Sequence, residues 1–187
     1  MNHYFDEDLL LSLNLQLLQS DVNAMLDSEK DLQEVLNEIL KWIGYESKNE
    51  ILTSILLYNK ETSQLFSGAA PSLPDRYNKA INGSKAGPIA GSCGTAAYFG
   101  KQVIVKDIAT DPLWENYKSL ALVEGLRSCW STPIFGVTND LLGTFAIYYK
   151  EPRKPTPHDL QLIDEIVGLT ATAIETRKAD FQEIVGL

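Results

Sequence analysis

Apolar residues near the N-terminus recur at alternating steps of four and three positions through residues 9–26. This spacing places one apolar side chain per turn on the same side of a helix, as in the seam of a coiled coil. We therefore predict a helix over residues 9–26, whose seam covers the protein's own core, contacts a second copy of the chain, or does both. The seam residues are Leu11, Leu15, Leu18, Val22 and Met25.

A polar break at residues 27–31 separates this pattern from a second helical pattern. Ser28 followed by Asp31 resembles a capping box, in which each side chain binds a backbone amide at the start of the new helix. The apolar seam keeps its phase across the break except at Glu29, so the pattern allows either two helices or one bent helix. The second helix places Leu32, Leu36, Ile39 and Ile43 on one side.

The middle of the chain contains short apolar runs that are rich in residues favouring strands. Two pairs of these runs are each joined by a brief polar segment, which predicts two hairpins. We predict strands at residues 51–58, 63–69, 103–108, 126–135 and 141–149, with the first two and the last two paired.

Helical signals lie between and after these strands. We predict a short helix at residues 71–82 and another from Pro112 to residue 123, capped by Asp111. Residues 83–94 contain four glycines and a proline, so we predict a loop there.

A long final helix is predicted to begin at Thr156. Thr156, Pro157 and Asp159 combine a capping side chain, a proline in the first turn and an acid at the third position. Apolar residues then recur at seven-residue spacing, which continues the helix toward the C-terminus. This row consists of Leu160, Val167, Ile174 and Phe181.

The order of these elements predicts an α+β domain with a central, largely antiparallel sheet and helices on its faces. A chain of 187 residues fits one mid-sized domain with helical extensions. Its 44% apolar and 22% charged residues are ordinary for a globular protein and argue against a disordered chain.

The net charge of −9 is concentrated in residues 1–50, which hold eleven acids and three bases. This charge disfavours nucleic acids and anionic membranes as partners, because both require an excess of Lys and Arg. No apolar run approaches the ~20 residues that a membrane span needs. The acidic start does not resemble a secretory leader, and two cysteines make no disulfide framework, so we expect a cytoplasmic protein.

Four motifs follow one another in the second half of the chain. Residues 91–98 read GSCGTAAY, residues 103–114 VIVKDIATDPLW, residues 125–134 GLRSCWSTPI, and residues 143–149 GTFAIYY. In this order and spacing they resemble a GAF domain, the sensory module attached to bacterial histidine kinases, diguanylate cyclases and transcription activators. The resemblance covers residues 28–176. It implies a six-stranded antiparallel sheet, a small-molecule pocket on one side, and flanking helices that form a parallel dimer and pass the signal onward.

The resemblance divides the chain into three parts: a dimerisation and signalling helix at residues 1–27, the sensory domain at residues 28–176, and a helical extension at residues 177–187. It implies a homodimer and a downstream effector (a histidine kinase, diguanylate cyclase or regulator) on the same chain or a separate one. A cyclic nucleotide is one expected ligand, because GAF domains of cyclases and phosphodiesterases bind such molecules. The expected dimer interface contains Leu11, Leu15, Leu18, Val22, Ile174 and Phe181.

We expect the pocket to be roofed by residues 71–98 and 107–124 and floored by the strands at residues 126–135 and 141–149. Aromatic side chains there would stack on a planar ligand, and two aspartates would accept hydrogen bonds from an amine or a ribose. The expected ligand-binding residues are Tyr77, Ser92, Cys93, Gly94, Thr95, Asp107, Asp111, Trp114, Tyr117, Cys129, Trp130 and Phe145.

We expect no catalysis by Cys93. A cysteine nucleophile needs a nearby base, and the two histidines of the chain, His3 and His158, are both distant in sequence. One catalytic GAF branch, the free methionine sulfoxide reductases, resembles this chain at residues 91–95. That branch carries a further catalytic cysteine where residues 111–116 here have none, so reductase activity remains only an alternative.

No cofactor or metal is expected. Bilin-binding GAF domains usually attach the pigment to a cysteine followed by histidine, a pair that this chain lacks. Residues 4–157 contain no histidine that would bind a haem, and the cysteines and histidines lack zinc spacing. A second alternative is a dimerisation scaffold whose pocket is empty or filled by its own aromatic side chains.

Overall fold

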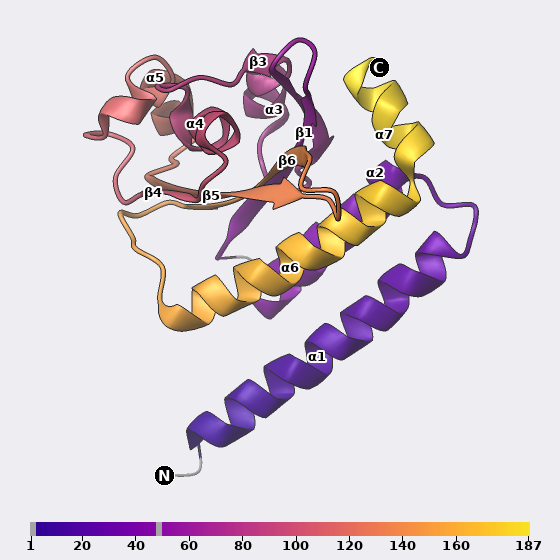
Figure 1. Ribbon diagram of the computed structural model, residues 1–187. Coiled ribbons are helices and arrows are strands. Elements are labelled where there is room, and N and C mark those ends of the chain that lie inside the picture. The colour runs from indigo at the N-terminus through magenta and orange to yellow at the C-terminus, as the bar shows by residue number, and fades with distance from the viewer. Residues whose placement is uncertain (1–2, 48–49) are drawn as a thin grey trace.

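The structure is a computed structural model that describes residues 3–47 and 50–187, with side chains from residue 11 onward (Figure 1). Its centre is a six-stranded antiparallel sheet with the strand order β3-β2-β1-β6-β5-β4. The predicted α+β class and central sheet are therefore confirmed. The strands are β1 (Leu52–Asn59), β2 (Gln64–Ala69), β3 (Ser84–Lys85), β4 (Val103–Val105), β5 (Ser128–Phe135) and β6 (Leu141–Tyr149).

Helices cover both faces of this sheet (Figure 1). Against one face lie α2 (Leu32–Glu46) and α6 (Pro157–Thr176), and α1 (His3–Leu26) packs on these two helices as an outer layer. The last helix, α7 (Lys178–Val185), contacts β1 and β2. The opposite face carries α3 (Asp75–Ile81), α4 (Gly91–Phe99), the 3₁₀ turn η1 (Pro112–Trp114) and α5 (Lys118–Val123).

Two hydrophobic cores lie on the two faces, because successive side chains of a strand point in opposite directions. In β5, Cys129 faces the core beneath α4, and Trp130 faces the core formed with α2 and α6. In β6, Tyr148 faces the core beneath α4, and Tyr149 faces the core formed with α2 and α6. The alternation in β5 and β6 thus decides which residues can share a site.

The break after α1 is a true interruption, so the first two helices are separate. The capping box at the start of α2 differs from the predicted one, because Asp31 is the capping residue and Glu34 its partner. Asp31 accepts the Glu34 amide at 2.8 Å, and Glu34 accepts the Asp31 amide at 3.0 Å. Ser28 instead donates its hydroxyl to the Met25 carbonyl at 2.7 Å and closes the end of α1.

The predicted final helix is interrupted at Arg177, which separates α6 from α7. The Arg177 guanidinium donates to the carbonyls of Leu26 at 2.8 Å, Ser28 at 2.7 Å and Lys30 at 2.9 Å. A cation at these positions satisfies carbonyls that a helix end leaves without partners. Hydrogen bonds from Arg177 therefore connect the α6–α7 break to the α1–α2 turn.

The predicted loop at residues 83–94 was wrong in its second half, because Gly91–Phe99 forms α4. Glycine disfavours a helix, but Gly94 lets this helix pack closely against the segment that precedes it. A side chain at Gly94 would place its Cβ 2.6 Å from the Ala90 Cβ and 3.2 Å from the Lys85 carbonyl oxygen. The predicted helix from Pro112 to residue 123 is also divided, into η1 and α5.

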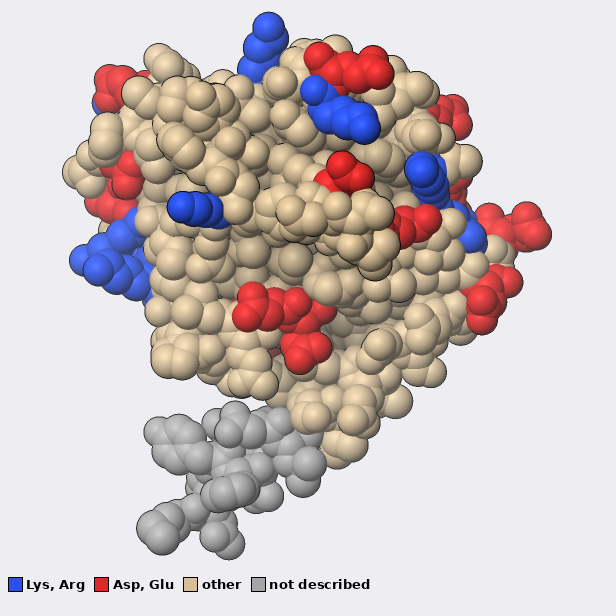
Figure 2. All heavy atoms as spheres, in the orientation of Figure 1, with Lys and Arg blue, Asp and Glu red and all other residues tan. Residues whose placement is uncertain are grey.

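None of the helices in the described part of the chain is both long and apolar enough to cross a membrane. On the face shown in Figure 2, acidic and basic side chains are interspersed rather than gathered by sign.

Candidate functional site

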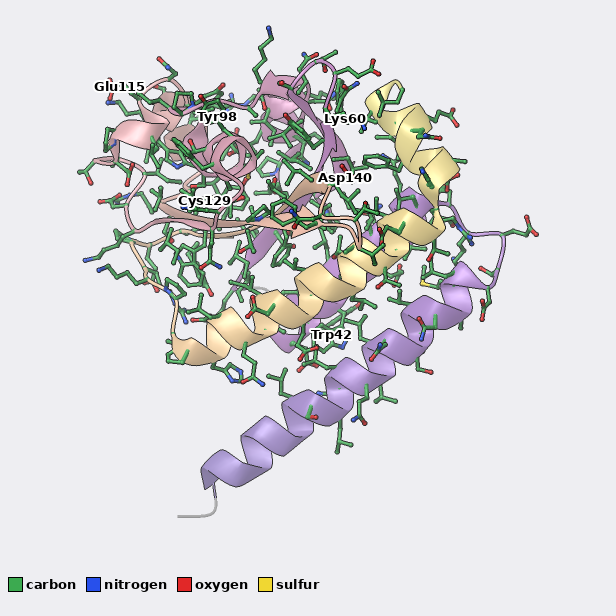
Figure 3. The ribbon with its side chains drawn as sticks, in the orientation of Figure 1. Trp42, Lys60, Tyr98, Glu115, Cys129 and Asp140 are labelled. Atoms are coloured by element: carbon green, nitrogen blue, oxygen red, sulfur yellow. The ribbon has the colours of Figure 1, made fainter. Side chains whose placement is uncertain are left out.

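The candidate site lies where α4 crosses β5 and β6. Five residues that are distant in sequence meet in this buried core: Tyr77 from α3, Cys93 from α4, Trp114 from η1, Cys129 from β5 and Tyr148 from β6. Figure 3 shows Cys129 on the sheet beneath α4. The predicted roof and floor therefore come together as expected, and four of these five residues belong to the predicted set.

A chain of two hydrogen bonds holds the roof on the sheet. The Trp114 indole N–H donates to the Ser92 hydroxyl at 3.0 Å, and that hydroxyl donates to the Cys129 carbonyl at 3.0 Å. These groups are buried, where an unpaired polar group costs more than it would in water. Ser92 thus positions η1, α4 and β5 against one another.

The Tyr148 hydroxyl lies at the centre of the site. It shares a hydrogen bond with Ser54 at 3.4 Å and is 3.8 Å from the Cys93 sulfur. The Tyr77 ring meets the Tyr148 ring edge to face, with centroids 5.9 Å apart. Sequence reasoning missed Tyr148 and Ser54, although strand alternation places Tyr148 and Cys129 on the same face.

Two further buried hydroxyls on this face, Ser131 of β5 and Thr144 of β6, find no hydrogen-bond partner among the described residues. Ser131 lies two positions after Cys129, so its side chain points to the same side of the sheet. A third such hydroxyl, Ser128, lies on β5 with the opposite parity and faces α2 and α6. The site therefore combines an aromatic wall with hydroxyls that have unused hydrogen-bonding capacity.

The polar surroundings perturb the titratable groups of the site. Hydrogen bonding by the Cys129 thiol, together with Ser131, Tyr148 and Thr144, lowers the pKa of Cys93 to about 7 despite its burial. Burial raises the pKa of Cys129 well above its usual value, and the adjacent Cys93 adds to this effect. Burial likewise raises the pKa values of Tyr77 and Tyr148 well above 10.0. The two thiols therefore differ: the surroundings favour the thiolate of Cys93 and the protonated form of Cys129.

Gly94 and Thr95 belong to α4 and are buried, as Ser92 and Cys93 are. The Thr95 hydroxyl accepts the Ala90 amide at 3.1 Å and so fixes the entry into the helix. Tyr117 is half-buried at the margin of the same core. These residues lie close to the site, and Thr95 has a structural partner.

The two predicted aspartates have local structural partners. Asp107 forms a two-pronged ion pair with Arg127, with contacts of 3.0 Å from one guanidinium nitrogen to both carboxylate oxygens. Asp111 accepts the Leu113 amide at 2.9 Å and caps η1, as predicted. Both carboxylates shape the segment that carries Trp114.

Trp130 and Phe145 are separated from the other predicted ligand-binding residues by the sheet. Both belong to the core against α2 and α6, and the Trp130 indole donates to the Arg153 carbonyl at 3.0 Å. The expectation of one chamber extending from Tyr77 to Trp130 is therefore corrected: adjacent positions of β5, such as Cys129 and Trp130, cannot face the same cavity.

Side chains fill the space where the sequence predicts an open chamber. Tyr77, Trp114 and Tyr148 are each at most 3% exposed, so a ligand of any size requires some of them to move. Two open hollows lie elsewhere. One is a groove of about 550 Å³ between α1 and α6, and the other, of about 390 Å³, is lined by α7 and the hairpin turns near Lys60 and Asp140 (Figure 3).

The residues expected at a dimer interface face the chain's own core. Leu18, Val22, Ile174 and Phe181 are buried there, and Leu11 and Leu15 are partly buried against it. The apolar seam of α1 therefore covers α2 and α6 of the same chain. In this arrangement a second copy would have to contact other parts of the helix.

No group of three or more His, Cys, Asp or Glu side chains in the described part of the chain is arranged to hold a metal ion.

A family model of the GAF domain matches residues 29–175. This chain therefore belongs to the GAF domain family, and the resemblance seen in its motifs is confirmed.

Over 169 residues the chain is 40% identical to the methyl sulfide methyltransferase-associated sensor of Methanosarcina acetivorans. The match covers 90% of this chain and 16% of that protein, so the chain spans only a small part of the relative's length.

Solved structures share the fold at low sequence identity. A domain named as part of a two-component sensor histidine kinase from Sinorhizobium meliloti 1021 has a TM-score of 0.65 and 18% identity, covering 83% of this chain and 98% of that one. Free methionine-R-sulfoxide reductase from Neisseria meningitidis has a TM-score of 0.66 and 16% identity, covering 88% and 90%. These likenesses show a common fold and do not transfer the reductase activity to this chain.

Proposed function

We propose that this chain is a regulatory GAF domain without catalysis of its own, which binds a small molecule beneath α4 and passes the change to its terminal helices. Membership of the GAF family and the relative that is named a sensor support this proposal. Residues 28–176 form the sensory unit, and the helical segments at residues 1–27 and 177–187 connect it to an effector. That effector is a histidine kinase, diguanylate cyclase or regulator, on the same chain or a separate one.

The buried hydroxyls of Ser131 and Thr144 carry the binding proposal. Buried polar groups are normally paired, and these two have no partner at hydrogen-bond geometry within the described residues, although both lie near the Cys93 thiol. A small polar molecule beneath α4 would supply hydrogen bonds to both, while Tyr77 and Trp114 would shift to make room. A ligand that binds the shifted arrangement better than the filled one changes the balance between them by that difference in affinity.

The Arg177 contacts offer a path from the sheet to α1. The α6 helix packs on β5, and its end is fastened to the α1–α2 turn through Arg177. The Asp180 carboxylate adds a second link, because it accepts the Leu32 amide at the start of α2 at 2.9 Å. A displacement of β5 would therefore reach both N-terminal helices.

We also propose that the chain forms a dimer through the outer side of α1. Leu13 and Leu17 lie one turn apart on this side and are 49% and 64% exposed. Two exposed leucines one turn apart are suited to packing against the same helix of a second copy.

A binding experiment tests the sensor proposal. Protein purified from expressing cells would be analysed by native mass spectrometry for bound molecules, and then by thermal shift with cyclic AMP and cyclic GMP. A specific ligand at 100 times its dissociation constant stabilises the folded state by ~2.7 kcal/mol. Thr144→Val should weaken the effect, whereas Ser128→Ala on the other face should preserve it.

The scaffold alternative gives the opposite result. Its specific support is the filling of the chamber by Tyr77, Trp114 and Tyr148. No co-purifying molecule, no thermal shift with either nucleotide and a stable dimer would together favour a dimerisation module that binds no ligand.

A further inference from the structure

The two cysteines of the chain meet beneath α4. Cys129 pairs with Tyr148 across the β5–β6 ladder, and the Cys93 sulfur is 3.8 Å from the hydroxyl of the same tyrosine. The neighbour of Cys93, Ser92, is bonded to the Cys129 carbonyl at 3.0 Å. Both cysteines belong to the same buried cluster beneath α4, and each affects the pKa of the other, although 36 positions separate them in sequence.

The surroundings of these thiols differ from those of an ordinary buried cysteine. An apolar environment raises the pKa of a thiol and makes it inert. Cys93 instead faces hydroxyls of Ser131, Thr144 and Tyr148, and the first two have no other hydrogen-bond partner in the described structure. Hydroxyl groups that donate to sulfur favour the thiolate over the thiol.

We propose that Cys93 and Cys129 form a redox-active pair that a small hydroperoxide converts into an intrachain disulfide between α4 and β5. The proposal does not depend on ligand binding at this site. It concerns only the two thiols and the hydroxyls around them.

The reaction has two steps. The Cys93 thiolate attacks one oxygen of the hydroperoxide, an S–O bond forms, the O–O bond breaks, and the leaving alkoxide or hydroxide takes up a proton. The Cys129 sulfur then attacks the resulting sulfenic acid, so that an S–S bond forms and the S–O bond breaks. The released hydroxide takes the Cys129 proton and leaves as water. Two thiols are thereby oxidised to one disulfide, and the hydroperoxide is reduced to an alcohol or water plus one further water.

The roles of the two cysteines follow from their positions. Both cysteines are buried, but 9% of the Cys93 residue is exposed and none of Cys129, so Cys93 lies nearer the surface and we assign the first attack to it. Its thiolate is available near neutral pH, because the pKa of Cys93 is lowered to about 7. Cys129 keeps its proton, since burial raises its pKa, and is suited to resolve the sulfenic acid.

A disulfide at this position would join the two free thiols covalently. It would tie the first half of α4 to the start of β5, next to the Ser92 bonds to Trp114 and Cys129. The roof of the site would then be less able to move away from the sheet. Oxidation would therefore act next to Trp114, which ligand entry requires to move and which is hydrogen-bonded to Ser92 beside the disulfide.

The first test uses the wild-type chain and no variant. Reduced protein is treated with hydrogen peroxide near pH 7.5, and its intact mass and proteolytic peptides are measured without reductant. We expect a mass lower by two hydrogens and one cross-linked peptide pair joining Cys93 to Cys129. An unchanged mass, oxygen addition without a cross-link, or a disulfide between two copies would overturn the proposal.

The second test assigns the roles. In Cys129→Ser we expect a sulfenic acid that a dimedone probe traps, whereas Cys93→Ser should lose its remaining thiol much more slowly. Equal reactivity of the two variants would contradict the assignment of Cys93 as the attacking sulfur. Circular dichroism of both variants checks that each is folded before its rate is compared.

The third test addresses the hydroxyls through the pH profile of Cys93 alkylation. The titratable groups that face this thiol are Cys129, Tyr148 and Tyr77. Ser131→Ala removes a donor to the thiolate, so the midpoint of the profile should rise and alkylation at pH 7 should slow about threefold or more. Ser128→Ala removes a comparable hydroxyl from the other face and should leave the profile unchanged; a matching slowdown there would refute the role of Ser131.

Discussion

At the scale of single residues, the site is defined by hydroxyls and thiols that share one face of the sheet. Tyr148 touches most of the others, because its hydroxyl lies between Ser54 and Cys93 and its ring meets Tyr77. Ser92 joins the roof to the floor through its two hydrogen bonds. These contacts lead to two predictions about stability.

The first concerns alkaline pH. Burial raises the pKa values of Tyr77 and Tyr148, so the unfolded state loses these protons first as the pH rises above about 10. Their contribution to the unfolding free energy is therefore fully present below about pH 10 and is lost as the pH rises further. Tyr148→Phe should make the decline in unfolding free energy between pH 9 and pH 11 shallower, as measured by urea denaturation. The matched variant Tyr98→Phe, at a 56% exposed position, should keep the wild-type slope.

The second concerns Ser92. Ser92→Ala leaves the buried Trp114 indole N–H without its acceptor, and a lost partner of this kind costs about 1–3 kcal/mol. Urea denaturation should show this loss, together with a change in Trp114 fluorescence. A control at the exposed Thr110, Thr110→Ala, should change stability by less than about 0.5 kcal/mol. A Ser92 variant as stable as the control would show that the bond does not hold the roof in place.

At the scale of elements, helix boundaries set by neighbouring residues were easier to predict than those set by distant parts of the chain. The capping box of Thr156 and Asp159 was predicted correctly, since both residues act within one turn. The break at Arg177 could not be predicted from the sequence, because its cause is a set of carbonyls about 150 positions away in the chain. Likewise α4 was missed, because its glycines are tolerated only where Lys85 and Ala90 approach the helix.

The break leads to a prediction about Arg177. Arg177→Gln removes charged donors to the α1–α2 turn, and we expect a loss of about 1–2 kcal/mol, because the guanidinium is partly exposed. Hydrogen exchange at residues 26–31 should become faster while the sheet keeps its protection. Lys178→Gln, next in sequence and exposed, provides the control. Unchanged exchange in the turn would mean that the Arg177 contacts do not restrain α1.

At the scale of the whole molecule, the sheet separates a helical support layer from the candidate site. The α1, α2 and α6 helices share one core, and the roof elements α3, α4, η1 and α5 share the other. The strands β5 and β6 belong to both cores. In the proposed mechanism, a change beneath α4 would pass to the terminal helices through these two strands, which contribute side chains to both cores.

Substitutions at two leucines separate a role in folding from a role in the proposed dimer. Leu18→Glu places a charge in the core and should cost at least about 3 kcal/mol, since even Leu→Ala at a buried position costs 2–5 kcal/mol. Leu17→Glu changes a 64% exposed position, so the unfolding free energy of the monomer should be unaffected. Light scattering should then show that Leu17→Glu weakens association. Wild-type mass for this variant would exclude the outer side of α1 as the dimer contact.

The sequence by itself determined the α+β class, the five longer strands and the family, because strand periodicity, capping residues and ordered motifs act locally. It also brought most of the site residues to attention, including Cys93, Cys129 and Trp114. Only the tertiary structure decided that Trp130 faces away from them, that Tyr148 and two hydroxyls join the thiols, and that the seam of α1 is covered by its own chain. These outcomes depend on strand register and on packing between distant segments, which no local pattern specifies.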